Sequence, residues 1–529
     1  MGGGIFASYL IILTNHMKKS INKFSRVLCA LLLCAGLVVA GCTEGPLGDD
    51  QNTEQGDNEN GGGHETPEPE APATVNLEDV TYNSATFTGR LNVAASDLSF
   101  SQVTIYYSDA EPFNTNAAQS LSAMSFDNDQ NFTITLTGLK SNTKYNYCVV
   151  TEVKSEKTYG DVLEFTTFPH PYDVVHDLTL SSATDLSSSA SANCYIVSNA
   201  GLYKFKTVKG HYSESIRNVA YASILWETFG TSEKLKYCDL IKSFCYKDGY
   251  IAFQTADTFK EGNAVIAAKD ANGNILWSWH IWLTDQPQGQ VYDKNAGTMM
   301  DRNLGATSAN PGDVGALGLL YQWGRKDPFL NSSSIHNDSM TEAESTITWP
   351  SAVSSNSSTG TIAYATANPT TFIKYNSSNK DWYYTGSSST DNTRWTTSDK
   401  KKSIYDPCPS GWRVPDGGSN GVWADAHGSI LYSGGYSYDS INKGMNFTGI
   451  FASSSTIWYP ASGCRYGWEY SDGGSLGGVG KEGSYWSASP SSNFAYRLYF
   501  LSYLDTYANV GTSECYERAN GQSVRCLQE

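Results

Sequence analysis

Apolar and polar residues alternate with a period of two along several short runs between residues 74 and 168. The clearest runs are SATFTGRLNV, SQVTIYYS, NFTITLTGL, KYNYCVVTEV and VLEFTTF, and turn residues separate them. Such alternation predicts half-buried strands, and five or more strands at this spacing predict a β-sandwich. Counted from Tyr145, the alternation places Tyr147 and Val149 inward and Cys148 outward.

Residues 175–285 predict a second sandwich. The stretch NAVIAAKDANGNILWSWHIWLTD places Asn272-Gly273, a favoured hairpin turn, between two alternating strands. The two faces of the second strand differ: Trp277, Trp279 and Ile281 lie on one, and Ser278, His280 and Trp282 on the other. A tryptophan stripe is either a sugar platform or, more often, core or a domain interface. No second histidine or carboxylate stands at metal-ligand spacing from His280, which favours core there too.

The pattern changes again over residues 289–529. Glycine becomes more frequent, the strands shorten and the loops lengthen. A Ser/Thr/Asn-rich segment at about 331–400 interrupts the region and reads as an insertion. The length of the chain predicts two to four domains in total.

The N-terminus sets the compartment. From Met17, the expected start, a basic stretch precedes an apolar one at 27–40, which predicts a signal region over 1–41. The segment ends in VAGC and resembles the lipobox of bacterial lipoproteins, which implies a lipid on Cys42. The following residues, to 73, carry nine acids and no Lys or Arg, which predicts a disordered tether. They resemble the acidic stretches of surface-exported Bacteroidetes lipoproteins, which implies outer-membrane anchoring that faces the exterior; periplasmic facing remains the alternative.

The net charge of the chain limits the classes of partner that we expect it to bind. The chain has a formal net charge of −17; residues 1–42 contribute four basic residues and no acid, so the remainder carries −21. This balance argues against nucleic acid and against binding anionic lipid through protein charge. The membrane contact that we expect is the lipid anchor alone.

The 74–168 region resembles the fibronectin type III family. Leu139 precedes Tyr145 as in a tyrosine corner, and GDVLEFTT closes the domain. The usual buried tryptophan of the second strand is missing, and we expect Phe87 to fill its space. A domain of this kind between an anchor and a head is expected to act as a spacer.

Five blocks in the last region carry a second resemblance: TMMDRNLGATS, GLLYQWGRKDPF, YDPCPSGWRVPDGG, WYPASGCRYGWEYSDGG and RANGQSVRCLQE. In this order they resemble the Fibrobacter major-paralogue (FISUMP) family, which is related to the C-type-lectin-like and formylglycine-generating-enzyme folds. The expected fold class is mainly β and multidomain. Two Ig-like or fibronectin type III-like sandwiches precede an α+β C-type-lectin-like domain at 289–529.

Catalytic motifs are missing from the sequence. The eight histidines are scattered, and neither HExxH nor CxxC occurs. We therefore expect no enzyme, no resident metal and no cofactor. An oxidoreductase like the formylglycine-generating enzymes is only a third hypothesis.

The cysteines are expected to form bridges in an oxidising compartment. Likeness to the lectin-like fold implies a bridge between Cys408 and Cys526, which lie in the CPSGW and VRC blocks, and a second bridge between Cys464 and Cys515. Cys238 and Cys245 could pair with each other or could be buried small side chains.

The same likeness implies a ligand loop before the last strands. That loop would present Tyr466, Trp468 and Tyr470 beside Asp472, because aromatic faces stack on sugar rings and carboxylates accept hydroxyl hydrogen bonds or hold calcium. The alternative is that these aromatics form local core. The EPN, QPD and WND signatures of calcium-dependent lectins are absent, so calcium is possible but no motif supports it.

The expected function is therefore non-catalytic binding at the cell surface. The partner would be a glycan or a cell-surface glycoprotein, as for an adhesin that could be associated with a fimbria. The alternative is capture of polysaccharide for a nutrient-uptake system.

Overall fold

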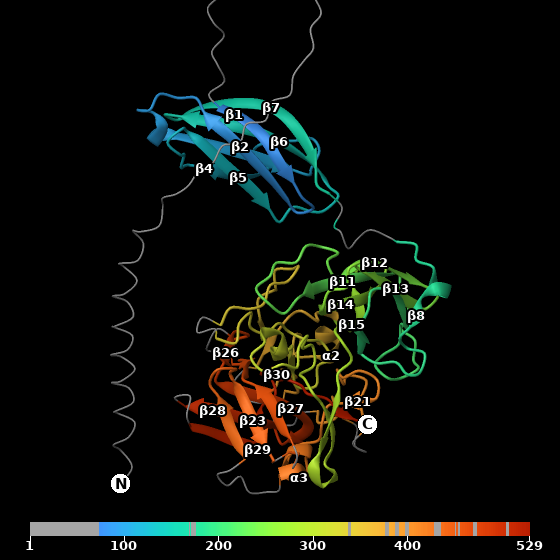
Figure 1. Cartoon of the computed structure of the whole chain (residues 1–529). Helices are drawn as coiled ribbons and strands as arrows, with labels where there is room; N and C mark the ends of the chain where they lie inside the picture. The colour runs from blue at the N-terminus through green and yellow to red at the C-terminus, as the bar shows by residue number, and fades with distance from the viewer. Residues whose placement is uncertain are drawn as a thin grey trace, which may run out of the picture. The chain divides into compact units, whose positions relative to one another are not determined.

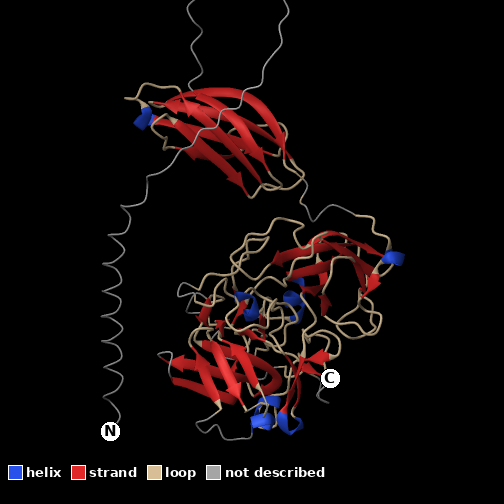
Figure 2. Cartoon of the chain, in the orientation of Figure 1, coloured by secondary structure: helices blue, strands red, loops and turns tan. Residues whose placement is uncertain are grey.

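Strands dominate the protein, and its helices are short (Figure 2). The computed structural model describes residues 73–529, apart from 169, 171–175, 337–339, 376–379, 387–390, 397–400, 428–434, 450, 453–454, 469–472 and 504–506. The predicted signal region, the lipidation at Cys42 and the acidic tether up to residue 72 lie outside the described residues.

Two antiparallel sheets form the first β-sandwich (Figure 1). One sheet has the order β1-β2-β5, with β1 at Ala73–Val80, β2 at Ser84–Leu91 and β5 at Asn131–Thr137. The other has the order β4-β3-β6-β7, with β4 at Gln119–Ala123, β3 at Ser101–Ser108, β6 at Lys144–Val153 and β7 at Glu156–Thr166. Apolar side chains from both sheets share one core.

The tyrosine corner predicted in this sandwich is present, because the Tyr145 hydroxyl accepts a hydrogen bond from the Lys140 N–H at 2.9 Å. Phe87 is fully buried beside Tyr147, as expected for the residue that replaces the missing tryptophan. The predicted alternation is confirmed, because Tyr147 and Val149 pack in the core between the sheets, whereas Cys148 lies on the opposite face of β6. Cys148 is nevertheless buried on that outer face, where its Sγ donates to the Gly160 carbonyl of β7 at 3.2 Å.

Residues 184–283 form a second sandwich from two four-stranded sheets. The first sheet has the order β12-β13-β10-β8, with β12 at Ile241–Lys247, β13 at Tyr250–Thr255, β10 at Leu202–Lys206 and β8 at Thr184–Asp185. The second has the order β11-β14-β15-β9, with β11 at Tyr221–Thr228, β14 at Gly262–Lys269, β15 at Ile275–Leu283 and β9 at Cys194–Val197. As predicted, Trp277, Trp279 and Ile281 lie in the core between the sheets.

The opposite face of β15 is buried as well. Trp282 packs in one core with Trp323 and Trp486 from beyond residue 289, and its Nε1 donates to the Ala306 carbonyl at 3.0 Å. Ser278 Oγ donates to Asp327 at 2.6 Å. This sandwich is therefore not an independent spacer but is joined to the C-terminal region through a shared core.

The C-terminal region holds several small sheets (Figure 1). Its longest sheet has the order β26-β25-β30-β27-β28-β29, with β26 at Leu476–Val479, β25 at Ser462–Arg465, β30 at Gly521–Ser523, β27 at Glu482–Ser491, β28 at Phe494–Tyr503 and β29 at Tyr507–Glu517, and β18 at Leu320–Gln322 pairs with β30. A four-stranded sheet has the order β16-β17-β31-β21, with β16 at Gly289–Tyr292, β17 at Gly297–Met300, β31 at Leu527–Gln528 and β21 at Trp412–Arg413. A three-stranded sheet has the order β22-β23-β24, with β22 at Tyr436–Asp439, β23 at Gly444–Thr448 and β24 at Thr456–Pro460. A two-stranded sheet pairs β19 at Val353–Ser354 with β20 at Ile373–Lys374. The helices described are α2 at Ile362–Ala367, α3 at Val422–His427 and 3-10 turns at Leu98–Phe100, Leu180–Ser182, Asp293–Asn295 and Val314–Leu317.

One of the two expected disulfides forms. Cys408, ahead of β21, is bonded to Cys526, ahead of β31, with a Cα–Cα distance of 6.1 Å. The expected bridge between Cys464 and Cys515 is wrong, and both thiols are free. Cys464 is on β25 and Cys515 on β29, with β30, β27 and β28 between them in the sheet, which is too far for a disulfide. Cys238 and Cys245 are also free.

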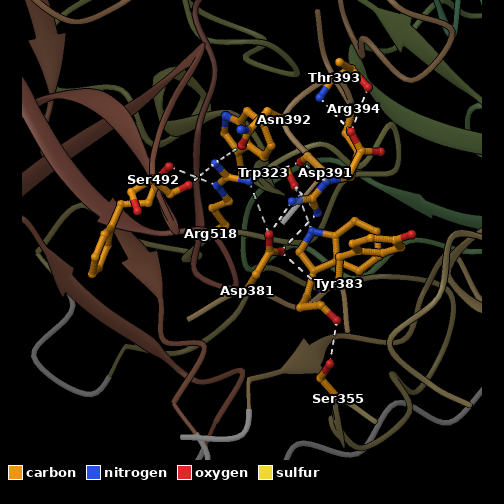
Figure 3. A network of polar contacts seen from close by, with 12 residues as sticks. Trp323, Ser355, Asp381, Tyr383, Asp391, Asn392, Thr393, Arg394, Ser492 and Arg518 are labelled. Atoms are coloured by element: carbon orange, nitrogen blue, oxygen red, sulfur yellow. Dashed lines mark hydrogen bonds and ion pairs between the residues drawn. The ribbon is translucent and has the colours of Figure 1, made fainter. Parts of the chain in front are cut away.

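Buried ion pairs connect the segment at about 331–400, which was expected to be an insertion, to the core. Figure 3 shows Asp381 between Arg394 and Arg518, around the ring of Trp323. Arg394 Nη1 donates to Asp381 Oδ1 at 3.0 Å, and the Asp381 and Arg394 side chains are both 0% exposed. The guanidinium carbons of Arg394 and Arg518 lie 4.9 and 4.3 Å from the Trp323 ring centroid. These pairs hold the segment against the sheet that carries β28 and β29.

Candidate functional site

The predicted ligand loop is described only at its ends. Tyr470 and Asp472 lie outside the described residues, whereas Tyr466 and Trp468 can be placed. Tyr466 is half-buried, and its ring lies so close to Gly477 that a Cβ there would be 2.1 Å from it. Burial raises the pKa of the Tyr466 hydroxyl. Tyr466 therefore packs locally, as the alternative interpretation expected.

Trp468 is different, because 51% of it is exposed. Two hydrogen bonds fix the backbone of Gly467, the residue before Trp468. The Gly467 N–H donates to Asn520 Oδ1 at 2.9 Å, and the Gly467 carbonyl accepts from the Tyr375 N–H at 2.9 Å. Lys380 Nζ lies 5.8 Å from the Trp468 ring centroid and pairs with Glu517 at 3.2 Å. The structure thus presents one aromatic ring on a fixed support.

A cleft of about 380 Å³ opens next to this loop. Its lining comes from three parts of the sequence, namely Phe329, the segment 342–372 and the segment from the end of β25 to residue 475: Phe329, Glu342, Trp349, Pro350, Ala352, Thr370, Phe372, Arg465, Gly473, Gly474 and Ser475. This volume is in the range of small-molecule sites in proteins.

Arg465 supplies the charged chemistry of the cleft. Its side chain is 8% exposed; Nε donates to the Leu330 carbonyl at 2.8 Å and Nη1 to the Gly474 carbonyl at 2.6 Å. Nη1 also lies 2.7 Å from Glu342 Oε1, and Glu342 is 39% exposed. No described residue accepts a hydrogen bond from Arg465 Nη2. The cleft therefore offers one fixed donor beside one accessible carboxylate acceptor.

Aromatic rings form the apolar wall. Phe372 packs edge-on against Phe329 with ring centroids 5.2 Å apart, and Trp349 lies 6.0 Å from Phe329. Trp349 is half-buried, and its Nε1 donates to Ser345 Oγ at 3.0 Å, which fixes the plane of the indole. A flat wall beside a donor and an acceptor suits a ring with one apolar face and several hydroxyls.

The cleft and the exposed tryptophan are neighbours, although Trp468 does not line the cleft. A Cβ on Gly473, which does line it, would lie 2.6 Å from the Trp468 carbonyl oxygen and 2.1 Å from Lys374 Cδ. Only glycine allows this close approach of the two ends of the loop. An extended ligand could reach both features.

Cys194, His280 and Asn263 form a chain that resembles a nucleophile, a base and an orienting amide. Cys194 Sγ lies 3.4 Å from His280 Nδ1, and His280 Nε2 lies 2.8 Å from Asn263 Oδ1. All three are buried, and burial raises the pKa of the Cys194 thiol and lowers the pKa of His280 to about 3. Both groups are neutral and closed off from substrate, so this is a satisfied polar cluster in the core, as expected for His280.

Among the residues with described positions, no group of three or more His, Cys, Asp or Glu side chains is arranged to hold a metal ion. Within the same part of the chain, no helix is long and apolar enough to cross a membrane.

No protein-family profile and no curated protein matches the chain. Among solved structures, the sensor domain of the anti-sigma factor RsgI4 from Pseudobacteroides cellulosolvens is 18% identical, covering 19% of this chain and 99% of that one, with a TM-score of 0.15. The FN1-FN3 domains of chicken CNTN1 are 18% identical, covering 18% and 30%, with a TM-score of 0.15. A redesigned β-sandwich protein is 16% identical, covering 18% and 92%, with a TM-score of 0.14. At such scores these likenesses carry no argument about function.

Three residues of the cleft were not identified from the sequence: Glu342, Trp349 and Arg465. Glu342 and Trp349 stand in a segment whose Ser/Thr/Asn content predicted an irregular insertion. The available signal was the presence of aromatic residues there, which an unstructured segment would lack.

Proposed function

We propose that the chain is a surface lipoprotein, anchored through Cys42, that binds a glycan or a glycoprotein without catalysis. The C-terminal region, which we assign to the FISUMP and C-type-lectin-like group, carries the binding site. The fibronectin type III-like sandwich holds this region away from an outer membrane whose exterior it faces. The lipobox-like VAGC and the acidic stretch after it support the anchoring.

The observation that carries the binding proposal is the cleft between Trp349 and Arg465. Arg465 Nη2 can donate to a sugar hydroxyl, and Glu342 can accept from a neighbouring one. An acidic sugar would bring a second negative charge next to the Glu342 carboxylate, and the net charge of the whole chain is already strongly negative. Both charges repel an anionic ligand, which disfavours acidic sugars. The site therefore suits a neutral sugar stacked on Trp349, with further units passing Trp468.

A glycan and extracellular-matrix array tests the proposal. The probe is the chain from residue 43 to 529, with and without calcium, alongside Trp349→Ala and Trp468→Ala variants. Tyr159→Ala is the matched control, because Tyr159 is a comparably exposed aromatic on the first sandwich.

We expect binding to neutral glycans that Trp349→Ala removes, that Trp468→Ala weakens for longer glycans and that Tyr159→Ala preserves. Host glycoproteins among the bound partners would favour adhesion, and bound soluble polysaccharides would favour nutrient capture. Binding that both tryptophan variants leave unchanged would reject the site.

A further inference from the structure

A second cleft, of about 500 Å³, lies in the second sandwich. Its lining comes from three separate stretches: the loop after β8, the segment from the end of β10 to residue 215, and the turn between β12 and β13. None of its lining residues belongs to the cleft around Arg465. We propose that this cleft is a second binding site, for a neutral sugar unit of a polysaccharide.

The walls of this cleft are fixed by hydrogen bonds between the three stretches. The Lys206 N–H donates to Ser187 Oγ at 2.9 Å, and the Thr207 N–H donates to the Gly249 carbonyl at 2.9 Å. Ser191 Oγ donates to the Tyr212 carbonyl at 3.2 Å. A site that is formed before its ligand arrives loses less conformational entropy on binding.

Small side chains line the second cleft and leave its volume open to a ligand. The stretch from Ser187 to Ser191 contains only serine and alanine, and Ser213 and Ser215 face the same cleft from another loop. The hydroxyls of Ser187 and Ser191 already donate within the protein, whereas Ser188, Ser189, Ser213 and Ser215 make no side-chain hydrogen bond to a described residue. A hydroxyl can donate one hydrogen bond and accept two, so these four match a ligand whose own groups both donate and accept. Sugar hydroxyls have this property, whereas phosphates and carboxylates only accept.

The two charges at the cleft point to the same class of ligand. Lys206 and Asp248 are exposed, lie in different stretches and form no ion pair with any residue whose position is described. Their sequence neighbours do pair, Lys209 with Glu214 and Lys247 with Asp177. The lining thus carries one cation and one anion, which favours a polar ligand without net charge over an anionic polymer.

Tyr212 supplies the apolar contact. It is 48% exposed, and its ring stacks on that of His211 with the centroids 4.6 Å apart. The stacking fixes the ring, which leaves a supported aromatic face to cover the apolar side of a pyranose. With the first cleft, the chain would bind a polymer at two places and gain affinity through a raised effective concentration.

The test is affinity electrophoresis of the 43–529 chain in gels that contain galactomannan, xyloglucan or a neutral glucan, with polygalacturonate as the acidic comparison. Ser189→Trp fills the second cleft from an exposed position, and Ser181→Trp places the same ring on an exposed serine outside it. Trp349→Ala disables the first cleft. Circular dichroism melts confirm that each variant folds.

We expect Ser189→Trp to weaken retardation by at least one neutral polysaccharide about tenfold, and the double variant with Trp349→Ala to abolish it, while Ser181→Trp migrates as the original chain does. Equal migration of Ser189→Trp and Ser181→Trp in every gel, or retardation by polygalacturonate alone, overturns the proposal. Loss through Ser189→Trp with no effect of Trp349→Ala would support the second cleft and reject the first, so the two proposals fail separately.

Discussion

At the scale of single residues, Asp406 positions the backbone of the YDPCPSGW motif around Cys408. One carboxylate oxygen accepts the Cys408 N–H at 2.9 Å, and the other accepts the Val414 N–H at 2.9 Å. Lys402 Nζ lies 3.8 Å away. Asp406 thus fixes the approach of Cys408 to its disulfide partner from inside the core. Burial raises its pKa to about 6, since the charged form is desolvated there.

This shift predicts a pH dependence of stability. Between pH 3.8 and 6 the native state binds more protons at Asp406 than the unfolded state does, so the free energy of unfolding falls as the pH rises through this window. The contribution is present below about pH 4 and lost above about pH 6, and it amounts to about 3 kcal/mol. Urea unfolding of the original chain and of Asp406→Asn at several pH values measures it.

The comparison with Asp406→Asn is needed because His280 titrates in the opposite sense. Its lowered pKa gives a contribution that is present above pH 6.5 and lost as the pH falls towards 3. This contribution cancels in the difference between the two chains. A difference in unfolding free energy that stays constant from pH 4 to 7 would contradict the assignment to Asp406.

At the scale of elements, the two predicted disulfides show which contacts the sequence can predict and which it cannot. The bridge between Cys408 and Cys526 followed from two motif blocks that stay adjacent in the fold. The bridge between Cys464 and Cys515 failed because the order of strands in a sheet follows from pairings distant in the sequence. The face of Cys148 was predicted correctly because alternation along a strand is a local property, whereas its burial on that face depends on the neighbouring strand β7. The cleft was missed because its two walls meet only in three dimensions.

Removal of the disulfide should destabilise the protein. The bridge closes a loop with a sequence separation of 118, and the chain-entropy model gives about 5 kcal/mol for loops of this length. We expect Cys408→Ala combined with Cys526→Ala to lose about that much unfolding free energy in urea. Cys515→Ser is the control, since that thiol is exposed and free. Equal stability of the two variants would show that the bridge contributes nothing.

The ion pairs around Asp381 give a second prediction for elements. Asp381→Ala leaves Arg394 and Arg518 buried without their carboxylate, which should cost about 3–5 kcal/mol of unfolding free energy. Asp257→Ala is the matched control, because Asp257 is 84% exposed in its pair with Lys242 and should change stability by less than about 1 kcal/mol. Similar urea midpoints for both variants would reject a structural role for this network.

At the scale of the whole molecule, the sequence predicted a mainly β chain, and the structure agrees. It did not predict that the second sandwich and the C-terminal region share a core. The alternation showed that both faces of β15 carry tryptophan, but a buried face does not reveal what covers it. Trp282 and Cys194 are covered by residues from beyond 289.

This shared core predicts joint unfolding. A fragment of residues 176–529 should fold and melt in one transition, whereas residues 289–529 alone would expose the surface that Trp226 and Trp282 cover. We expect the shorter fragment to lack near-ultraviolet circular dichroism and to bind a hydrophobic dye. A shorter fragment with a cooperative melt would mean that the two parts are independent.

The central claim is that the cleft around Arg465 binds a neutral sugar, and calorimetric titration of the strongest glycan from the array against Glu342→Gln tests it most directly. This change keeps the shape of the side chain but removes the charged acceptor, so we predict about tenfold weaker binding by a chain that still melts cooperatively. Glu164→Gln, on the exposed edge of the first sandwich, should bind as the original chain does. Binding by Glu342→Gln within twofold of the original chain would contradict the claim.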